Sequence, residues 1–413
     1  MEITLLRHGE SAANLAGRWQ GQGDTPLTEQ GRRQVATAAG RVATWGVDRV
    51  LSSDLGRARQ SAAALNLPVE VDPAWREADI GAWEGLTRGE VMERFPDQLE
   101  ALAAGRDVPL GGGERMSEFR SRIEEAFEKL LGGLDEDDHV LVVTHGGVVS
   151  GLAAWVLGLG FERRRRIGRL TNCSLTTLRI GDEGRQVLRY NDAAHLGALT
   201  GWVADRWGAG ETVISLIRHA QSEANLSGRW QGLGDGGLSE LGTGQVRGLA
   251  GWYGELDLLY ASRLRRARNT AGGLRSAAGV LDEHPRLHEM AMGEWEGRTS
   301  DEIQAGWADL WQRIYEEGED LPLGAWGETF RQVAARMRAA LAELAESHTG
   351  ARFGVVSHGW AIRAYLGDLL GLDHRTRRRL VTPFNTSVSH VVVGEEGITV
   401  ADFNVAPHLE PPP

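Results

Sequence analysis

Short apolar runs alternate with longer stretches of helical spacing in the first half of the chain. The stretch 115–131 is the clearest helix, because Met116, Phe119 and Ile123 recur at a spacing of three to four residues. Helices are predicted at 28–43 after a Thr28 N-cap, from about 54, irregularly over 86–104 with a break at Pro96, at 115–131 and at 147–157. Strands are predicted at 3–7, 47–52, 139–144, 174–180 and 186–190. This alternation predicts a mostly parallel sheet with helices on both faces.

The same pattern returns about 210 residues later. Residues 7–21 and 218–232 are identical at 11 of 15 positions, and both stretches follow an apolar run typical of a strand. His219 follows His8 by 211 residues, and His358 follows His145 by 213. A period of this length is that of a whole domain, because the repeats of solenoid proteins are only about 20–50 residues long. We expect two tandem domains at 1–197 and 212–413, joined by a linker at 198–211.

Composition and charge exclude some classes of partner. The 413 residues carry a formal net charge of −12, which argues against general binding to nucleic acid or to an anionic membrane surface. The one cysteine, Cys173, excludes an intrachain disulfide and fits a reducing compartment. The chain enters a strand and a motif by residue 8, without a signal-peptide pattern. We expect a cytoplasmic protein.

The stretch from Val140 to Phe161 is almost free of charge and resembles a membrane span in composition. Its interior contains His145 and two glycines, and its counterpart at 353–372 contains Arg363 and Asp368. A buried strand that leads into a buried helix explains both stretches better. We therefore expect no membrane association.

An Arg-His pair stands at the end of the first predicted strand in each half. A phosphate monoester carries up to two negative charges, and its transfer requires those charges to be bound and a nucleophile to attack in line. Arg7 and Arg57 carry planar guanidinium groups that match phosphate oxygens. A neutral imidazole such as that of His8 can attack phosphorus.

Further candidate residues follow the other strands. His145 follows the strand at 139–144 and is expected beside His8, because the carboxyl ends of parallel strands meet at one edge of a sheet. Glu77 is the natural general acid for the leaving oxygen, and Asn14 and Asn172 are candidate neutral donors. The corresponding residues of the second half are Arg218, His219, Asn225, Arg266, Glu289, His358 and Asn385.

Other conspicuous residues have a structural explanation. Trp19, Trp83, Trp230 and Trp295 are more readily explained by core packing than by ligand binding. The acidic run at 135–138 is typical of a solvated turn. The Arg-His pairs, the later arginine, the glutamate and the second histidine recur in the same order in both halves, so chance is a poor explanation for them.

As a set, these motifs resemble the histidine phosphatase superfamily, which has the phosphoglycerate-mutase-like fold. The resemblance covers nearly the whole chain, once in each half. It rests in the first half on Arg-His-Gly-x-Ser-x-x-Asn at 7–14, Ser-Asp-Leu-x-Arg-Ala-x-Gln-Ser-Ala at 53–62, Glu77 ahead of Asp-Ile-Gly-Ala-Trp-Glu-Gly, and Thr-His-Gly-Gly at 144–147.

The resemblance implies two three-layer α/β/α domains, each with a mostly parallel central sheet. It implies a phosphohistidine on His8 and on His219, with Arg7, Arg57 and His145 around the phosphoryl group. Glu77 would protonate the leaving group and then activate water, and no metal or other cofactor would be required. The segments 83–85 and 111–115 look closer to the phosphatase branch than to glycolytic mutases. That branch includes broad-specificity phosphatases and the α-ribazole phosphatases of cobalamin synthesis.

The second half departs from the pattern at three places. Ala220 replaces Gly9, and Gly236-Gly237 replaces Thr25-Pro26, which exchanges a stiff loop for a more flexible one. Trp360 replaces Gly147 beside the second histidine and is expected to narrow that pocket. We therefore expect the two sites to differ in substrate or rate.

The sequence thus predicts a tandem phosphomonoesterase of the histidine acid phosphatase type, acting on a small-molecule phosphate ester. Three alternatives remain open at this point: a cofactor-dependent phosphoglycerate mutase, a phosphoprotein phosphatase, and a phospholigand-binding protein with one inert half. We also expect the halves to dock as an intramolecular pseudo-dimer, because a short tether raises their effective mutual concentration to about the millimolar range.

Overall fold

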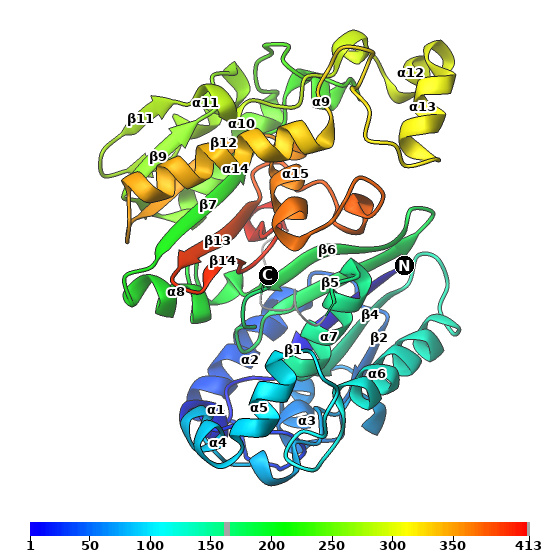
Figure 1. The fold of residues 1–413 in the computed structure, drawn as a ribbon, viewed down its shortest axis with the longest axis vertical. Helices are drawn as coiled ribbons and strands as arrows, with labels where there is room; N and C mark the ends of the chain where they lie inside the picture. Colours follow the sequence, from blue (N-terminus) through cyan, green and yellow to red (C-terminus); the bar gives the residue numbers. More distant parts are fainter. Residues whose placement is uncertain (161–165, 411–413) are drawn as a thin grey trace. The chain divides into compact units, whose positions relative to one another are not determined.

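The computed structural model describes residues 1–160 and 166–410 and divides into two compact units (Figure 1). Of the described residues, the first unit comprises 1–160 and 169–201, and the second comprises 166–168 and 202–410. Phe161, at the end of the apolar stretch, and residues 411–413, at the end of the second predicted domain, lie outside the described residues. Each unit contains one copy of the repeat.

The elements of the first unit follow the order predicted from the apolar pattern. Its strands are β1 (Glu2–Arg7), β2 (Arg49–Ser52), β3 (Val69–Val71), β4 (His139–Thr144), β5 (Leu175–Gly181) and β6 (Gly184–Asp192). Its helices are α1 (Ala12–Leu15), α2 (Glu29–Val42), α3 (Gly56–Ala63), α4 (Arg88–Arg94), α5 (Pro96–Ala103), α6 (Met116–Leu131) and α7 (Gly146–Leu157). Helix α2 begins where Thr28 accepts the Gly31 N–H, and α7 ends at Gly158, whose φ of 69° is left-handed.

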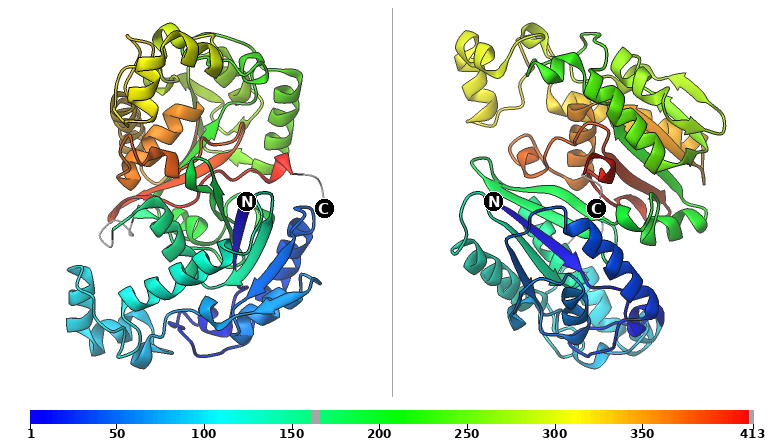
Figure 2. Two further views of the ribbon diagram at one scale, coloured as in Figure 1. Left: turned by 90° about the vertical axis from the view of Figure 1, so that its right-hand side faces the viewer. Right: turned by 180° about the vertical axis from the view of Figure 1, so that it is seen from behind.

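The strands of this unit form one six-stranded sheet in the order β3-β2-β4-β1-β5-β6 within the described residues. The pairs β3–β2, β2–β4 and β4–β1 are parallel, whereas β5 and β6 join the sheet antiparallel. Helices lie on both faces of the sheet (Figures 1 and 2). The structure therefore confirms the predicted three-layer α/β/α class with a mostly parallel sheet.

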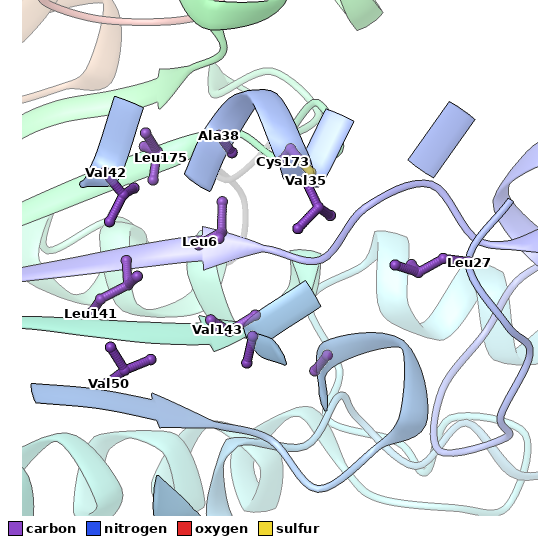
Figure 3. Packing of buried hydrophobic residues seen from close by; sticks show 12 residues of the cluster. Leu6, Leu27, Val35, Ala38, Val42, Val50, Leu141, Val143, Cys173 and Leu175 are labelled. Carbon is purple, nitrogen blue, oxygen red and sulfur yellow. The ribbon is translucent and has the colours of Figure 1, made fainter. Parts of the chain in front are cut away.

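A continuous apolar layer joins the sheet to α2 and α3. Leu6 of β1 and Leu141 of β4 belong to the same buried cluster as Val35 and Ala38 of α2 (Figure 3). These side chains are almost completely removed from water, and burying each large aliphatic chain contributes about 1.5–3 kcal/mol. This layer holds the end of β1, and with it Arg7 and His8, in a fixed position.

The second unit repeats the architecture. Its sheet runs β11-β9-β12-β7-β13-β14 among the residues described, with β13 and β14 again antiparallel. Its strands are β7 (Thr212–Arg218), β8 (Glu255–Leu256), β9 (Leu258–Ala261), β10 (Arg275–Ser276), β11 (Val280–Glu283), β12 (Arg352–Ser357), β13 (Val388–Gly394) and β14 (Gly397–Val400). Its helices are α9 (Glu223–Leu226), α10 (Glu240–Tyr253), α11 (Arg265–Ala271), α12 (Ser300–Gly306), α13 (Ala308–Tyr315), α14 (Phe330–Ser347) and α15 (Gly359–Leu370).

Two regions are more ordered than the sequence pattern indicates. Helix α8 (Gly201–Gly208) lies inside the predicted linker 198–211, and Val203 on it is buried. Strand β3 was not predicted, because three residues are too few to show a periodicity of two. In both places tertiary packing supplies an order that the local pattern does not carry.

Within residues 1–160 and 166–410, none of the helices combines the length and the apolar character that a membrane crossing requires. The apolar stretch that begins at Val140 is strand β4 followed by helix α7, as predicted.

Candidate active site

The two histidines of the first half meet at the carboxyl edge of the sheet. Arg7 is paired in register with Thr144 on the neighbouring parallel strand, so His8 and His145 leave the sheet side by side. Their ring centroids lie 5.2 Å apart. His145 is also the N-cap residue of α7, a helix of 12 residues whose N-terminal end favours negative charge.

The ring of His8 is oriented by its own main chain. His8 Nδ1 lies 2.7 Å from the carbonyl oxygen of Gly9, and because a carbonyl can only accept, Nδ1 carries the ring proton. The Nε2 lone pair accepts a hydrogen bond of 3.3 Å from Arg57 Nε. Burial, Arg7 and Arg57 together hold the pKa of His8 well below its usual value. The ring is therefore neutral near pH 7, and its Nε2 lone pair is directed at Arg57.

Arg7 is a buried cation, and its Nε–H is a hydrogen-bond donor without a partner among the described residues. Its Nη1 donates to the carbonyl of Leu170, whereas Nε has no hydrogen-bond partner among the described residues. Burial lowers the pKa of Arg7 to about 10, so the guanidinium is still charged at neutral pH. An unpaired buried donor costs free energy, and a ligand oxygen would satisfy it.

Arg57 is held rigidly by the loop that follows the first motif. Its Nη1 donates to the carbonyl of Gly23 at 2.8 Å and its Nη2 to that of Gly21 at 2.7 Å. Only 1% of Arg57 is exposed, and these two bonds aim Nε at His8. A phosphoryl group bound to His8 would meet a guanidinium that is already in place.

His145 has one ring nitrogen bound and one open. Its Nε2 lies 2.8 Å from Ser53 Oγ, which already accepts the Leu55 N–H at 3.4 Å. When the serine hydroxyl donates to His145 Nε2, Nδ1 carries the ring proton. Nδ1 is buried and has no partner in the described part of the chain. It is the second open donor of the site.

Glu77 reaches the site from a loop and is held by main-chain donors. The Gly147 N–H donates to Oε2 at 2.8 Å, and the Ala78 N–H donates to Oε1 at 2.9 Å. Gly147 lies two residues after His145, so the carboxyl group stands at the N-terminus of α7 beside the imidazoles. Its negative charge partly offsets the effect of burial on the pKa values of Arg7 and Arg57.

Asn14 and Asn172 support the main chain at His8. Asn172 Nδ2 donates to the carbonyl of His8 at 3.1 Å and to Asn14 Oδ1 at 3.0 Å. Asn14 also closes the capping box of α1 with Ser11. A direct contact of Asn14 with substrate stays a prediction.

The second half reproduces this geometry. His219 Nδ1 lies 2.7 Å from the Ala220 carbonyl, and Arg266 Nε donates to His219 Nε2 at 3.3 Å. The ring centroids of His219 and His358 are 5.0 Å apart. Burial and neighbouring charge hold the pKa values of both histidines well below the usual value.

The open donors recur as well. Arg218 Nε and His358 Nδ1 are buried without a partner in residues 1–160 and 166–410, as are their counterparts in the first half. Arg218 Nη1 donates to the carbonyl of Pro383, and burial lowers the pKa of Arg218 to about 10. Asn385 Nδ2 bonds the His219 carbonyl at 2.9 Å and Asn225 Oδ1 at 3.3 Å.

The two halves differ around the glutamate. A Cβ atom at Gly147 would lie 2.0 Å from Glu77 Oε1, so no side chain fits there without moving the carboxylate. The second half has Trp360 at this place, and Glu289 accepts N–H groups from Trp360 at 3.2 Å and from the next residue, Ala361, at 3.0 Å. Glu289 is only 6% exposed, whereas Glu77 is half-buried.

Sequence reasoning missed two groups of supporting residues. Ser53 and its counterpart Ser262 orient the second histidine of each site. Arg122 donates to the carbonyl of Glu77 at 3.3 Å while its Nε binds Glu114, and Arg336 makes the same contacts with Glu289 and Glu328 in the second half. The signal was present in the repeat, because each of these residues recurs with an offset of 209 to 214.

Among the residues that the structure describes, no group of three or more His, Cys, Asp or Glu side chains is arranged to hold a metal ion.

A family model and several known proteins match this chain. The model of the histidine phosphatase superfamily (branch 1) matches residues 3–193 and again 214–406. The protein named "Probable phosphoglycerate mutase GpmB" of Erwinia tasmaniensis is 36% identical over 183 residues, which are 43% of this chain and 83% of the relative. The protein of the same name in Serratia proteamaculans is 40% identical over 185 residues, which are 43% of this chain and 83% of that relative.

Two solved structures each match a stretch that is about as long as one half of the chain. Mycobacterial glucosyl-3-phosphoglycerate phosphatase has 31% identity and a TM-score of 0.42, and the match covers 45% of this chain and 96% of that protein. The α-ribazole phosphatase of Shigella flexneri has 27% identity and a TM-score of 0.41, with 45% and 94% covered.

Proposed function

This chain belongs to the histidine phosphatase superfamily, and from that premise we propose that each half hydrolyses small-molecule phosphate monoesters through a phosphohistidine intermediate. The nucleophiles would be His8 and His219. Arg7, Arg57 and His145 would bind the phosphoryl oxygens in the first site, and Arg218, Arg266 and His358 in the second. Glu77 and Glu289 would act as general acids that donate a proton to the leaving oxygen.

The observation that carries this proposal is the pair of open donors beside a neutral imidazole. Arg7 Nε and His145 Nδ1 are buried and unpaired among the described residues, and Arg218 Nε and His358 Nδ1 repeat the arrangement. Buried donors in folded proteins are nearly always paired, so an orphaned pair indicates a missing acceptor. Phosphoryl oxygens are acceptors of the correct charge.

In the first step, His8 Nε2 attacks phosphorus and the bond from phosphorus to the ester oxygen breaks. The leaving oxygen takes a proton from the carboxyl group of Glu77, so the alcohol departs neutral. The Arg57 Nε–H, which points at Nε2 in the free site, would pass to a phosphoryl oxygen. Hydrogen bonds between ionised partners are about twice as strong as neutral ones and suit the charge of the transition state.

In the second step, water attacks phosphorus from the side that the alcohol has left. Glu77, now a carboxylate, accepts the proton of that water, and the nitrogen–phosphorus bond breaks. Inorganic phosphate leaves, and the imidazole is again neutral. Burial and the two arginines favour this neutral form, since they hold the pKa of His8 well below its usual value.

We propose that neither step needs a metal ion, because the charge on phosphate is met by two arginines and a ring N–H. The test is hydrolysis after exhaustive treatment with a chelator. An unchanged rate supports the proposal, and a loss of activity that added Mg²⁺ or Zn²⁺ restores would refute this part of it.

The decisive experiment traps the intermediate. The protein is mixed with a phosphate ester, quenched in alkali and digested, and the peptides are analysed by mass spectrometry. We expect base-stable phosphorylation at His8 and His219, and its absence at each site after substitution of that histidine by alanine. Hydrolysis without any phosphohistidine would overturn the mechanism.

The mutase is the second candidate, because the curated relatives described above bear the name of a probable phosphoglycerate mutase. A mutase returns the phosphoryl group from histidine to a second hydroxyl of the substrate, whereas a phosphatase passes it to water. Incubation with 3-phosphoglycerate and a trace of 2,3-bisphosphoglycerate separates the two. Release of inorganic phosphate supports our proposal, and formation of 2-phosphoglycerate would replace it.

A further inference from the structure

The two sites differ most on the side where the leaving group of a substrate must lie. The general acid has to touch the leaving oxygen, so the alcohol lies beside Glu77 in the first site and beside Glu289 in the second. The residue whose N–H binds that carboxyl group is Gly147 in the first half and Trp360 in the second. The second site therefore has an indole side chain next to its leaving-group position.

The indole of Trp360 is fixed against two other rings. Its centroid lies 5.4 Å from that of Trp230, and 5.5 Å from that of Phe330 on α14. Trp230 lies in the loop after α9, and its contact with Trp360 places it on the same side of Glu289 as that indole. Trp360 and Trp230 are both half-buried, so neither residue is fully enclosed by the protein.

Two residues of α13 extend this aromatic wall. Trp311 lies 6.1 Å and Tyr315 6.4 Å from Trp230, measured between ring centroids. The first half has Leu99 and Ala103 at the equivalent positions of α5, because Thr87 and Thr299 cap matching helices 212 residues apart. The second half has thus replaced a glycine, a leucine and an alanine by three aromatic residues.

Arginine side chains hold the outer part of the wall. The guanidinium of Arg377 lies 4.6 Å from the ring centroid of Phe330 and 5.6 Å from that of Tyr315, and Arg378 lies 5.1 Å from the ring centroid of Tyr315. Cation–π contacts of this kind restrict ring rotation. A rigid aromatic surface favours a flat ligand, since little ordering is required on binding.

On the basis of the proposed function, we infer that the second site selects phosphate monoesters whose leaving group carries a planar aromatic ring. Trp360 and Trp230 would be the specificity-determining residues, with the ring of the ester lying against their accessible faces. Aromatic pairs gain from offset or edge-to-face contact beyond their buried area. The first site, with Gly147 at this position, has no such preference.

The experiment compares two esters that differ in planarity but not in the type of leaving group. Benzyl phosphate and cyclohexylmethyl phosphate both release a primary alcohol of similar size, so intrinsic reactivity is matched. The His8→Ala chain reports the second site alone, and the His219→Ala chain reports the first. We expect the benzyl-to-cyclohexylmethyl ratio of kcat/KM to be about tenfold higher in the His8→Ala chain, which corresponds to about 1.4 kcal/mol.

Substitutions at Trp360 then test whether its ring causes the preference for the benzyl ester. In the His8→Ala background, Trp360→Leu retains a Cβ atom and bulk but removes the ring, and it should lower the ratio to that of the first site. Trp360→Phe keeps a ring and should preserve most of the ratio. Trp326→Leu is the matched control, because Trp326 lies in the same half and is 66% exposed.

The outcomes separate this inference from the proposed function. Equal ratios in the two single-site chains, or a ratio that Trp360→Leu leaves unchanged, would overturn the aromatic preference while hydrolysis itself continues. Failure of both chains to hydrolyse either ester would instead refute the proposed function. Should Trp360→Leu fail to fold, competitive inhibition of the two single-site chains by benzyl- and cyclohexylmethylphosphonate measures the same preference without that variant.

Discussion

The two halves of this protein share one arrangement of histidines and arginines and differ in what surrounds it. In both, an arginine donates to the first histidine of the site at 3.3 Å, and that histidine is oriented by the carbonyl of the next residue at 2.7 Å. On the leaving-group side, the first half has Gly147 and the second has Trp360 with an aromatic wall behind it.

The difference follows from how each region is built. The arrangement of histidines and arginines is held by main-chain groups at strand ends and in one loop, so its geometry depends on the sheet. For example, the carbonyls of Gly21 and Gly23 hold Arg57, and those of Gly232 and Gly234 hold its counterpart. Around the glutamate, the halves differ in side chains from α13, from the start of α15 and from the loop that contains Trp230, all of which lie outside the sheet. The side chains around the glutamate can therefore differ between the halves while the main-chain contacts of the arginine stay the same.

The interiors of the two halves also differ. In the first, Arg41 forms a two-bond ion pair with Asp192, at 2.8 and 2.7 Å, in a place removed from water. In the second, Tyr253 bonds Ser215 at 2.6 Å and lies 2.7 Å from His390, whose other ring nitrogen lies 2.7 Å from Asp402. Two copies of one fold thus fill part of their cores with different polar groups.

The largest expected effect comes from removing both nucleophiles. The His8→Ala, His219→Ala double variant should retain no hydrolysis above the uncatalysed background, because no group remains to form the intermediate. Each single variant should keep the activity of the other site. Steady-state hydrolysis of a panel of phosphate esters measures this. If His8→Ala alone removes all activity toward every ester, the second half is inert and the comparison fails.

The next effect concerns the two glutamates. Glu77→Gln in the His219→Ala background should lower hydrolysis of alkyl phosphates by about 10²–10⁴-fold, because a basic leaving oxygen needs a proton. Activated aryl phosphates leave without that help and should lose less. Glu289→Gln in the His8→Ala background is the matching test of the second half. Equal losses for both classes of ester would remove the glutamate from the role of general acid.

A stability effect should be confined to the first half. Although burial opposes it, Arg41 lowers the pKa of Asp192 to about 2, so the pair is ionised at neutral pH. Asp192→Ala would leave a buried arginine without its carboxylate and should cost about 3–5 kcal/mol. Calorimetry should show one transition shifted to lower temperature, with loss of the His8 site before the His219 site. A shift of both transitions by the same amount would show that the halves do not unfold separately.

The smallest expected effect is a dependence of stability on pH, and both halves should show it. The folded-state pKa values of His8, His145, His219 and His358 all lie well below the usual value, because burial favours neutral imidazole. The unfolded chain therefore binds protons below about pH 6.5 that the folded chain does not, and stability falls as pH decreases from there. Above that pH the four histidines do not change the free energy of unfolding further.

Each such histidine contributes at most about 1.4 kcal/mol per pH unit in this range. The free energy of unfolding by urea, measured from pH 7.5 to 5.5, tests the sign and the slope. His8→Asn should reduce the slope for the first half only. Stability that rises on acidification over this range would contradict the neutral state assigned to the four rings.

Much of the architecture could be predicted from local signals in the sequence. The apolar runs located β1, β4 and α7, and the repeat showed that the chain contains the same domain twice. Because the predicted strands are mostly parallel, the sequence also placed His8 and His145 at one edge of the sheet. These predictions succeed because burial periodicity and strand ends depend on residues that are close in sequence.

The supporting residues could not be assigned in this way. Ser53 reaches His145 across 92 residues, and Arg122 reaches the Glu77 carbonyl across 45. Trp230 and Trp360 were expected only to pack or to narrow a pocket, yet they lie together with α13 as one aromatic surface. Such contacts depend on how helices pack over the sheet, which no local pattern encodes.

By itself, the sequence determined the duplicated α/β architecture, the chemical groups of each site and the order in which the strands present them. Tertiary structure alone decided which buried donors in the described residues have no partner, where Glu289 lies once Trp360 occupies the glycine position, and which rings pack against Trp360. The physical reason is that residue types and their periodicity act locally, whereas an unpaired donor or a shared aromatic face is a property of atoms brought together from distant parts of the chain.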